Sequence, residues 1–553
     1  EVNGSIFICG RNANKKELKD FSLEVPPNPI FGDYAINCIK IKKDPKELAK
    51  KIRVDKGLPL LIEKTEVKGP YLNFFINKEL LVKKTINNIL KQKSKYGSQD
   101  IGKNQKIMIE FSSPNANKPL HIGHLRNNII GISLSNLLEF TNHKVIKANL
   151  INDRGIHICQ TMLAYKKYNK KPTTKPDHFV GELYVLFNKK LKEDPKLEQE
   201  AQELLKKWEK KDKETIQLWK KITSWCIDGI KETYKNTNIN FDVWFYESNF
   251  YNKASPIIKY GLEKKVFKKE PDNSITIDLE DYHLGKKTIL RSDGTSIYFT
   301  NDLALTKYKF EKYNLNKSLW VVASEQNMYF KQLFKTFELL NYKWSKNCYH
   351  LSYGLVHLPE GKMKSREGRV IDADNLLKET IKLAKEEVKK RKIKNKIEKR
   401  AKSIALAAIN YSLIKPDIQK DILFNPEKAI SFEGDTGPYI QYAYARCTSI
   451  LKKAKKIENK IVKPEEPEAI ELVKHISIFP EIIKDSATKL KPNLLANYVY
   501  ELSQKFSNFY EKCPCINEPN KNLRNTKLLI VKATKQVIEN SLKLLNIAVL
   551  EEM

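Results

Sequence analysis

The chain of 553 residues lacks both a long hydrophobic run and a paired-cysteine motif. No apolar stretch approaches the roughly 20 residues that a membrane-spanning helix needs, and the N-terminus lacks the basic-then-apolar order of a signal peptide. The eight cysteines are scattered, and the close pair Cys513 and Cys515 lacks the CxxC spacing of a zinc site. We therefore expect a soluble, cytoplasmic protein with no membrane partner, no structural zinc and no metal cage of its own.

Negative charge is scarce relative to positive charge. The chain has 66 Asp and Glu against 100 Lys and Arg, which gives a formal net charge of +34. Such an excess favours a polyanionic partner, because it attracts phosphates over long range and releases their counterions. A proteome rich in lysine and asparagine would produce the same excess. Charge alone leaves both explanations open.

A chain of this length is too long to fold around one compact hydrophobic core, so we expect several domains. Residues 1–95 mix short apolar runs with helical stretches, which indicates a small α+β domain. Across residues 96–385, strand-like runs alternate with helical patterns and predict a Rossmann-like parallel sheet, with a helical insertion around residues 165–240. Residues 386–553 are almost wholly helical and predict an all-α bundle. The predicted fold class is α/β with these two additional domains.

The segment SSPNANKPLHIGHLRN (112–127) lies between a buried strand, residues 107–111, and a helix with an apolar face. This order places the helix N-terminus, with its unpaired N–H groups and positive dipole end, where a phosphate can bind. His121 and His124 are three residues apart, so both face one side of the first turn, and Gly123 lets a flat base or ribose approach. Two imidazole donors there suit an α-phosphate in a five-coordinate transition state.

The string His121-Ile122-Gly123-His124 matches the HIGH signature of the class I aminoacyl-tRNA synthetases, and its surroundings resemble the arginyl-tRNA synthetases among them. The resemblance extends over nearly the whole chain. It is carried further by FGDYAIN (31–37), FDVWFYES (241–248), LRSDGTSIYFTNDLA (290–304), SEQ (324–326), LPEGKMKSREGRVIDADNL (358–376) and GDTGPYIQYAYARCTSIL (434–451). It implies an ATP-dependent ligase that forms arginyl-adenylate and transfers arginine to the 3′ end of tRNA(Arg) in protein biosynthesis.

The resemblance also implies the ligands of the protein. L-Arginine and ATP would be substrates, magnesium would accompany ATP to neutralise its phosphates, and tRNA(Arg) would bind the bundle and the N-terminal domain. In the bundle, a predicted helix carries residues that combine aromatic faces for unstacked bases with a phosphate-binding cation: Tyr439, Gln441, Tyr442 and Arg446. The alternative is that this tyrosine stripe is core. We expect a monomer.

A guanidinium is best held by carboxylates that accept paired N–H bonds, and a desolvated pocket needs negative charge to offset it. By resemblance, Glu247 and Asp302 are those carboxylates, with Tyr298 one helical turn before Asp302. Asp302 could instead be a carboxylate favoured by a helix N-terminus. The resemblance assigns further residues to the amino and carboxylate groups of arginine: Ser113, Asn115, Asp153 and Gln326. The loop around Asp153 departs from the commoner Gly-Asp-Trp-Gly of the family.

Class I enzymes carry a second signature, KMSK, which helps to bind ATP and whose last lysine stabilises charge on the leaving pyrophosphate. Here it reads Lys362-Met363-Lys364-Ser365, so the expected fourth lysine is absent. Another cation is needed, because charge that builds on the β and γ phosphates must be met by a preorganised group. Lys118, three residues before His121, is the main candidate; Lys362, Lys364 and Arg366 are alternatives.

Three other functions compete with this interpretation. A class I enzyme for cysteine would show zinc-ligand cysteines, and one for glutamate would need cations where Glu247 and Asp302 stand. A non-catalytic RNA-binding descendant fits the altered second signature but not the intact His121 and His124. A small-molecule nucleotidyltransferase shares an HxGH helix but has no use for the long helical C-terminal domain.

Overall fold

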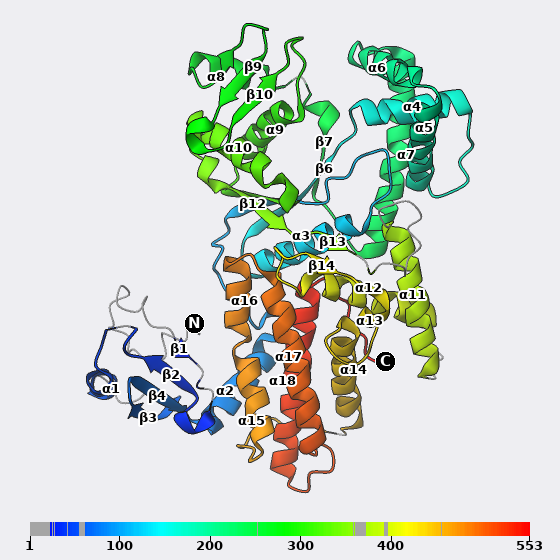
Figure 1. The fold of residues 1–553 in the computed structure, drawn as a ribbon. Coiled ribbons are helices and arrows are strands. Elements are labelled where there is room, and N and C mark those ends of the chain that lie inside the picture. The colour runs from blue at the N-terminus through cyan, green and yellow to red at the C-terminus, as the bar shows by residue number, and fades with distance from the viewer. Residues whose placement is uncertain are drawn as a thin grey trace.

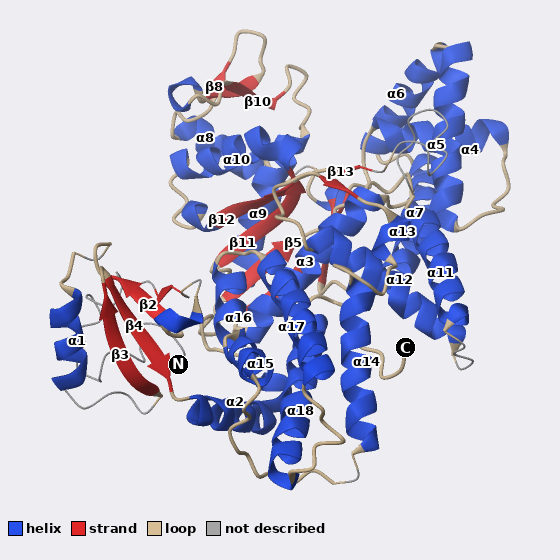
Figure 2. Ribbon diagram, turned by 60° about the horizontal axis from the view of Figure 1, so that its bottom comes forward, coloured by secondary structure: helices blue, strands red, loops and turns tan. Residues whose placement is uncertain are grey.

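The computed structural model describes residues 23–54, 61–357, 359, 372–391 and 396–553, except residues 25, 27, 41, 252 and 455. In these residues the chain forms a small N-terminal sheet, a central domain on a parallel sheet, and a helical bundle (Figure 1). Figure 2 shows the small sheet to one side of the bundle. The predicted α/β fold class with an N-terminal α+β domain and a helical C-terminal domain is confirmed.

The N-terminal sheet is antiparallel, with the strand order β1-β2-β4-β3. Its elements are β1 (Leu23–Glu24), β2 (Tyr34–Asn37), α1 (Pro45–Val54), β3 (Ile62–Lys68) and β4 (Tyr71–Ile76). Alternate residues of β4, Leu72 and Phe74, are buried on one face against Ile36. An ion pair of 2.5 Å between Lys474 and Asp33 ties this sheet to the bundle.

The central sheet is parallel and has the strand order β12-β11-β5-β6-β7. Its strands are β5 (Lys106–Glu110), β6 (Lys144–Ile151), β7 (Val243–Tyr246), β11 (Lys317–Ala323) and β12 (Cys348–Tyr353). Chain order reverses between β5 and β11. In an open α/β sheet the ligand crevice forms at such a switch point, beyond the carboxyl ends of the strands.

Helices cover both faces of this sheet. Ile109 and Val321 face α3 (Ile122–Phe140), whereas their neighbours Met108 and Trp320 belong to the core under α9 (Tyr298–Tyr313) and α10 (Asn327–Leu339). Strands buried on both faces read as continuous apolar runs, as Ile107, Met108 and Ile109 of β5 do. Before α9 come the helix α8 (Ser255–Glu263) and a small antiparallel sheet of β8 (Lys268–Lys269), β9 (Ile275–Asp278) and β10 (Lys286–Leu290).

Four helices are inserted between β6 and β7 and form the group at the upper right of Figure 1. They are α4 (Ile156–Tyr168), α5 (Pro176–Glu193), α6 (Lys196–Glu209) and α7 (Lys213–Thr237). Their core includes an aromatic cluster in which Trp225 makes edge contacts with Tyr165 and Phe179. Trp208 meets Trp219 in the same way. The scattered tryptophans of this charged segment therefore pack the helices together.

The bundle packs against the face of α3 that points away from the central sheet. Helix α2, from the N-terminal part of the chain, packs within this bundle. Its helices are α2 (Lys78–Gln92), α11 (Ala373–Lys390), α12 (Ile397–Ile414), α13 (Pro426–Ala429), α14 (Gly437–Lys453), α15 (Pro467–Ser477), α16 (Phe479–Thr488), α17 (Pro492–Lys512) and α18 (Lys521–Leu544). A short parallel pair, β13 (Val356–His357) and β14 (Ile422–Leu423), links it to the central domain. Among the described helices, none combines the length and apolarity that crossing a bilayer requires.

Candidate active site

The HIGH segment begins α3 beyond the carboxyl end of β5. His121 is the N-cap residue of α3, and its Nδ1 accepts a hydrogen bond of 3.1 Å from the Gly123 amide. The His124 Nδ1 accepts one of 3.2 Å from the His121 amide, so the two imidazoles close the first turn as a capping box does. Their ring centroids lie 3.9 Å apart. Both rings therefore stand together at the helix N-terminus.

Both imidazoles are neutral at physiological pH. Burial and the nearby Lys118 lower the pKa of His121 to about 4. Burial, with His121 and Lys118, holds the pKa of His124 well below its ordinary value. Because each Nδ1 accepts an amide hydrogen, each neutral ring carries its proton on Nε2. Each ring thus has an Nε2–H with which to bind a phosphate oxygen without adding charge.

Two residues in the turn after the signature, Arg126 and Asn127, hold it in place. The Arg126 side chain is fully buried and donates to backbone carbonyls on two other segments: Gly354, Leu355, Ile418 and Lys420. The Asn127 Oδ1 accepts from the Ser112 amide at 2.6 Å, and its Nδ2 donates to the Val321 carbonyl at 2.7 Å. Arg126 therefore anchors α3 to the start of the bundle, and Asn127 fixes the preceding loop against β11.

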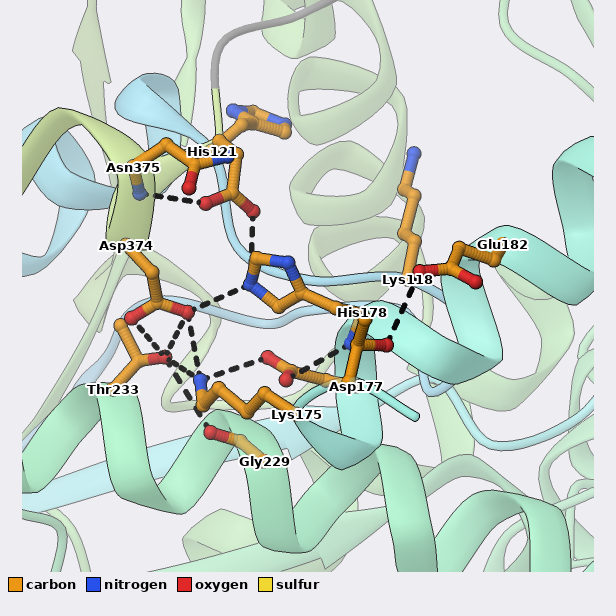
Figure 3. A network of polar contacts seen from close by, with 12 residues as sticks. Lys118, His121, Lys175, Asp177, His178, Glu182, Gly229, Thr233, Asp374 and Asn375 are labelled. Atoms are coloured by element: carbon orange, nitrogen blue, oxygen red, sulfur yellow. Dashed lines mark hydrogen bonds and ion pairs between the residues drawn. The ribbon is translucent and has the colours of Figure 1, made fainter. Parts of the chain in front are cut away.

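Lys118 is half-buried in the loop before His121. Among the described residues its ammonium has no hydrogen-bond or ion-pair partner. After burial, the charge of Lys118 is the next cause that lowers the pKa of His157 to about 4. Figure 3 shows the Lys118 side chain extending to the same side as the His121 ring. The Lys118 cation thus stands beside the imidazoles at the N-terminus of α3.

Glu247 follows β7 and begins a 3-10 turn, Glu247–Asn249. Its side chain is buried: Oε1 accepts a hydrogen bond of 3.2 Å from Asn301 Nδ2, and Oε2 has no partner among the described residues. Burial and then the charge of Asp302 raise the pKa of Glu247 to about 8. A buried carboxylate with an unpartnered oxygen is costly, so a cationic donor would be stabilised here.

Asp302 lies in the first turns of α9, close enough to Glu247 for the two charges to interact. Its Oδ2 accepts a hydrogen bond from the Tyr329 hydroxyl at the start of α10. Burial raises the pKa of Asp302 to about 6, and the Tyr329 hydrogen bond opposes that rise. Tyr298, one turn earlier on α9, is 55% exposed, and its pKa is raised by burial and by Glu247. Two acidic groups and a phenol therefore gather at one place.

Asp153 lies just after β6, and its buried side chain contacts Ser248, the residue that follows Glu247. Its carboxylate accepts hydrogen bonds from the Ser248 amide, at 2.9 Å, and from the Ser248 hydroxyl, at 2.7 Å. Burial raises the pKa of Asp153, whereas these hydrogen bonds lower it. Asp153 thereby fixes the turn that carries Glu247.

The other polar residues expected to bind the amino and carboxylate groups of arginine lie beyond β5 and β11. The backbone of Asn115 bridges to Asn152, which places it beside the loop of Asp153. The Ser113 amide donates to Asn149 Oδ1 at 3.1 Å, so its backbone is fixed by β6. Gln326 is exposed at the end of the 3-10 turn Ser324–Gln326 that follows β11. All three lie near the carboxyl edge of the central sheet.

The second signature falls outside the described residues. This applies to Lys362, Met363, Lys364, Ser365 and Arg366. The described chain resumes at Asp372, whose backbone forms an isolated antiparallel bridge with His121. The segment that follows the second signature therefore contacts the first.

In the bundle, the four residues predicted to contact RNA divide into two kinds. Gln441 is fully buried, and its Nε2 donates to the Ala548 carbonyl at 2.6 Å, so its side chain packs α14 against the chain end. Arg446 donates to the Tyr442 hydroxyl at 2.9 Å and lies over the Tyr442 ring. Tyr439 is half-buried. Tyr442 and Arg446 form a partly exposed aromatic and cationic pair.

Sequence reasoning missed three residues of this site. Asn301 and Tyr329 orient the two acidic groups, and His157 lies in the first turn of α4 with an Nε2 that has no partner among the described residues. Asn301 immediately precedes Asp302, and Tyr329 follows Gln326 by three residues. Adjacency to candidate residues was the signal available for both.

Comparison with known proteins places the chain by family. The family described as "tRNA synthetases class I (R), catalytic domain" matches residues 85–425. The "DALR anticodon binding domain" matches residues 440–553, and the "Arginyl tRNA synthetase N terminal domain" matches residues 6–76. The parallel sheet with the signature helix at its switch point is thus the catalytic domain of a class I aminoacyl-tRNA synthetase, an ATP-dependent ligase.

Full-length relatives identify the family within that class. The arginine–tRNA ligase of Treponema denticola is 42% identical, over 99% of this chain and 97% of its own. That of Borreliella burgdorferi is also 42% identical, over 100% of this chain and 98% of its own. The chain belongs to the arginyl-tRNA synthetase family. The Thermus thermophilus arginyl-tRNA synthetase structure shares the fold, with a TM-score of 0.84 at 24% identity over 97% of this chain and 98% of that one.

Proposed function

We propose that the protein activates L-arginine with ATP and transfers the arginyl group to the 3′ end of tRNA(Arg). The observation that carries this proposal is the buried Glu247 carboxylate, which has an unpartnered oxygen and lies near Asp302 in a class I catalytic domain. The test is ATP–pyrophosphate exchange with each of the twenty amino acids, with and without tRNA(Arg). Exchange with arginine alone is expected; exchange with another amino acid, or with none, contradicts the proposal.

In the first step, a carboxylate oxygen of arginine bonds to the α-phosphorus of ATP, and the bond from that phosphorus to the β-bridging oxygen breaks. Negative charge grows on the equatorial oxygens and on the departing pyrophosphate. The Nε2–H groups of His121 and His124, held at the N-terminus of α3, donate hydrogen bonds to the equatorial oxygens. Gly123 leaves space for the nucleoside. A terminal ribose hydroxyl of tRNA then attacks the arginyl carbonyl carbon, and AMP leaves.

Lys118 supplies the positive charge for the pyrophosphate. Its ammonium lacks a protein partner within the described chain and lies near His121, so it is available to a phosphate. Lys362 and Lys364 are further candidates, and Met363 and Ser365 would contact ATP. Magnesium would enter with ATP and neutralise its phosphates. Among the described residues, the cluster with metal-ligand spacing is Asp177, His178 and Asp374, and the Lys175 ammonium already lies between its carboxylates, so the ion would be carried by the nucleotide.

The arginine side chain binds Glu247 and Asp302, with Tyr298 beside them. Its guanidinium has five N–H donors in a planar fork, which suits the unpartnered oxygen of Glu247 and the second oxygen of Asp302. Ser113, Asn115 and Gln326 bind the amino and carboxylate groups. Asp153 acts through Ser248 on the placement of Glu247, and it can also accept from the α-ammonium.

The bundle binds the anticodon arm of tRNA(Arg), since the matched family is an anticodon-binding domain. Tyr439, Tyr442 and Arg446 would stack on bases or contact phosphate, whereas the buried Gln441 maintains the helix that carries them. We propose domain boundaries near residues 95 and 385. We also propose that the enzyme is a zinc-free monomer acting in the cytoplasm, where tRNA charging supplies protein synthesis.

A further inference from the structure

A network of charged and polar side chains lies beside the HIGH segment, on the side of the inserted helices (Figure 3). At its centre Lys175 Nζ is 2.7 Å from Asp374 Oδ2, 3.2 Å from Asp177 Oδ2 and 2.5 Å from Thr233 Oγ1. Thr233 Oγ1 also lies 3.0 Å from Asp374 Oδ1. Asp177 is fully buried, and Asp374 and Thr233 are nearly so. Such carboxylates persist only where a cation and hydrogen bonds offset their desolvation.

His178 adds a second hydrogen-bond donor to the same carboxylate. Its Nε2 lies 2.9 Å from Asp374 Oδ2 and 3.3 Å from Asp372 Oδ2. The hydrogen bond with Asp374 is the main cause that raises the pKa of His178. Although burial opposes it, the hydrogen bonds from His178 and Lys175 lower the pKa of Asp374 to about 2. Asp374 is therefore ionised and held from two sides.

The network joins three segments that are distant in sequence. Lys175, Asp177 and His178 stand at the start of α5, Thr233 lies on α7, and Asp374 begins α11. The approach of α5 to α7 is so close that a Cβ at Gly229 would lie 2.4 Å from Asp177 Oδ1 and 2.5 Å from its amide nitrogen. Only glycine allows this contact. The three helix segments are thus fixed relative to one another.

Each of these three helices also contacts the loop that precedes α3. From α5, the backbone at Gly181 approaches Pro119, since a Cβ there would lie 2.8 Å from Pro119 Cδ. From α7, Cys226 Sγ donates to the Lys118 carbonyl at 3.6 Å. From α11, the Ala373 amide donates to the Leu120 carbonyl at 2.9 Å. Residues 118–120 are therefore held from three directions by the helices that the network ties together.

The network has no need of a metal ion. Asp177, His178 and Asp374 offer three ligand atoms within 4.8 Å of one another. The Lys175 ammonium, however, already lies among the oxygens of Asp177, Asp374 and Thr233, and a divalent ion would have to displace it. The arrangement is a closed set of internal ion pairs.

We propose that the Lys175–Thr233–His178–Asp374 network positions Lys118 and His121 for adenylate formation. The inference rests on the proposed function and extends it, because that function assigns these four residues no contact with arginine or ATP. They act through the backbone of residues 118–121, which they hold between α5, α7 and α11. A displacement of about 1 Å in reacting groups lowers the rate of the chemical step by up to about 100-fold, while binding at a separate subsite persists. The network therefore governs kcat and leaves the arginine KM unchanged.

The test compares Asp374→Asn and Thr233→Val with the wild-type chain in ATP–pyrophosphate exchange at saturating tRNA(Arg). Asp374→Asn removes the shared carboxylate charge, and Thr233→Val removes one hydroxyl without changing side-chain shape. We expect kcat per active site to fall by about 10- to 100-fold in Asp374→Asn, and less in Thr233→Val, with the arginine KM within about twofold. Active sites are counted by equilibrium titration with arginine, whose binding the proposal leaves unchanged, so loss of folded protein does not affect kcat.

A matched control removes a carboxylate from another buried lysine. Glu518 Oε2 lies 2.6 Å from Lys527 Nζ in the bundle, and its side chain is 12% exposed, against 9% for Asp374. Glu518→Gln should leave kcat per active site unchanged. Two results overturn the inference: unchanged kcat per active site in Thr233→Val and Asp374→Asn, or an arginine KM that rises as much as kcat falls. If Asp374→Asn does not fold, Thr233→Val alone decides.

Failure of the proposed function is seen separately. It would appear as absence of arginine-dependent exchange in the wild-type chain, before any variant is compared. That result would also reject the inference about the network. A wild-type chain that exchanges with arginine, together with variants of unaltered kcat per active site, would reject the positioning role alone.

Discussion

The Tyr329 hydroxyl donates a hydrogen bond to the Asp302 carboxylate, and so joins the first turn of α10 to the first turns of α9 across the candidate arginine pocket. Tyr329 is held by aromatic contacts with Phe299 and Phe330. The phenol is therefore a fixed donor, and it favours the ionised form of Asp302. Since a guanidinium needs that ionised form, we expect Tyr329 to affect arginine affinity although it follows Asp302 by 27 residues.

Tyr329→Phe keeps the ring and removes the donor. A hydrogen bond to a charged group contributes about 1.5–3 kcal/mol, so we expect the arginine KM to rise by about tenfold or more. Loss of the donor also raises the pKa of Asp302 further above about 6, so the defect should be larger at pH 6.5 than at pH 8. Steady-state exchange at both pH values measures this. Tyr282→Phe, at an exposed tyrosine, is the control; equal KM values in wild type and Tyr329→Phe would refute the prediction.

Arginine affinity should depend on pH through Glu247. With no ligand bound, its pKa is about 8, because burial and Asp302 disfavour the charged form. Below pH 8 the carboxyl is mostly protonated, and binding of a guanidinium, which favours the carboxylate, releases that proton. The dissociation constant of arginine should therefore fall as pH rises from 6.5 to 8, by at most about tenfold per pH unit, and level off above pH 8.5.

Calorimetric titration with arginine in two buffers of different ionisation enthalpy measures the proton released. We expect release at pH 7 and little at pH 9. Glu247→Gln should bind arginine weakly and without that proton release. A wild-type chain that binds arginine with no buffer dependence at pH 7 would show that Glu247 is already ionised in the empty pocket.

Lys118→Ala tests the replacement of the missing signature lysine. Removal of a preorganised group from a developing charge typically lowers the rate by about 10²–10³-fold, and we expect a loss of this size in kcat for exchange with little change in the arginine KM. The exposed Lys171→Ala controls for the loss of one positive charge from the protein. If Lys364→Ala or Lys362→Ala causes the larger loss while Lys118→Ala does not, the charge comes from the second signature.

Arg126→Lys should destabilise the protein although it keeps the charge. The Arg126 fork donates to carbonyls on two segments, and a lysine ammonium cannot span them. Each buried carbonyl left without a donor costs about 1–3 kcal/mol, so the free energy of unfolding should fall by several kcal/mol. Thermal unfolding measures this, with the exposed Lys171→Arg as a control. An unchanged unfolding temperature would mean that the carbonyls find other donors.

The sequence by itself determined the fold class and the family, because both depend on short-range patterns. Strand-length apolar runs that alternate with helical periods predict a parallel sheet, and the strand, loop and helix around His121 and His124 predict a phosphate site at a helix N-terminus. Motif order along the chain then identified the family. Each of these patterns and motifs is made of residues that are neighbours in the chain, and the structure and comparisons confirm the fold class and the family.

Tertiary structure alone decided which residues act together. Arg126 and Asn127 belong to the same sequence motif as His121, yet they anchor the helix and leave the imidazole Nε2–H groups to the ligand. The pairing of Tyr329 with Asp302, the burial of Gln441 and the raised pKa of Glu247 all depend on segments far apart in sequence. Periodicity and spacing describe one element at a time, whereas desolvation and hydrogen-bond partners arise only when elements pack.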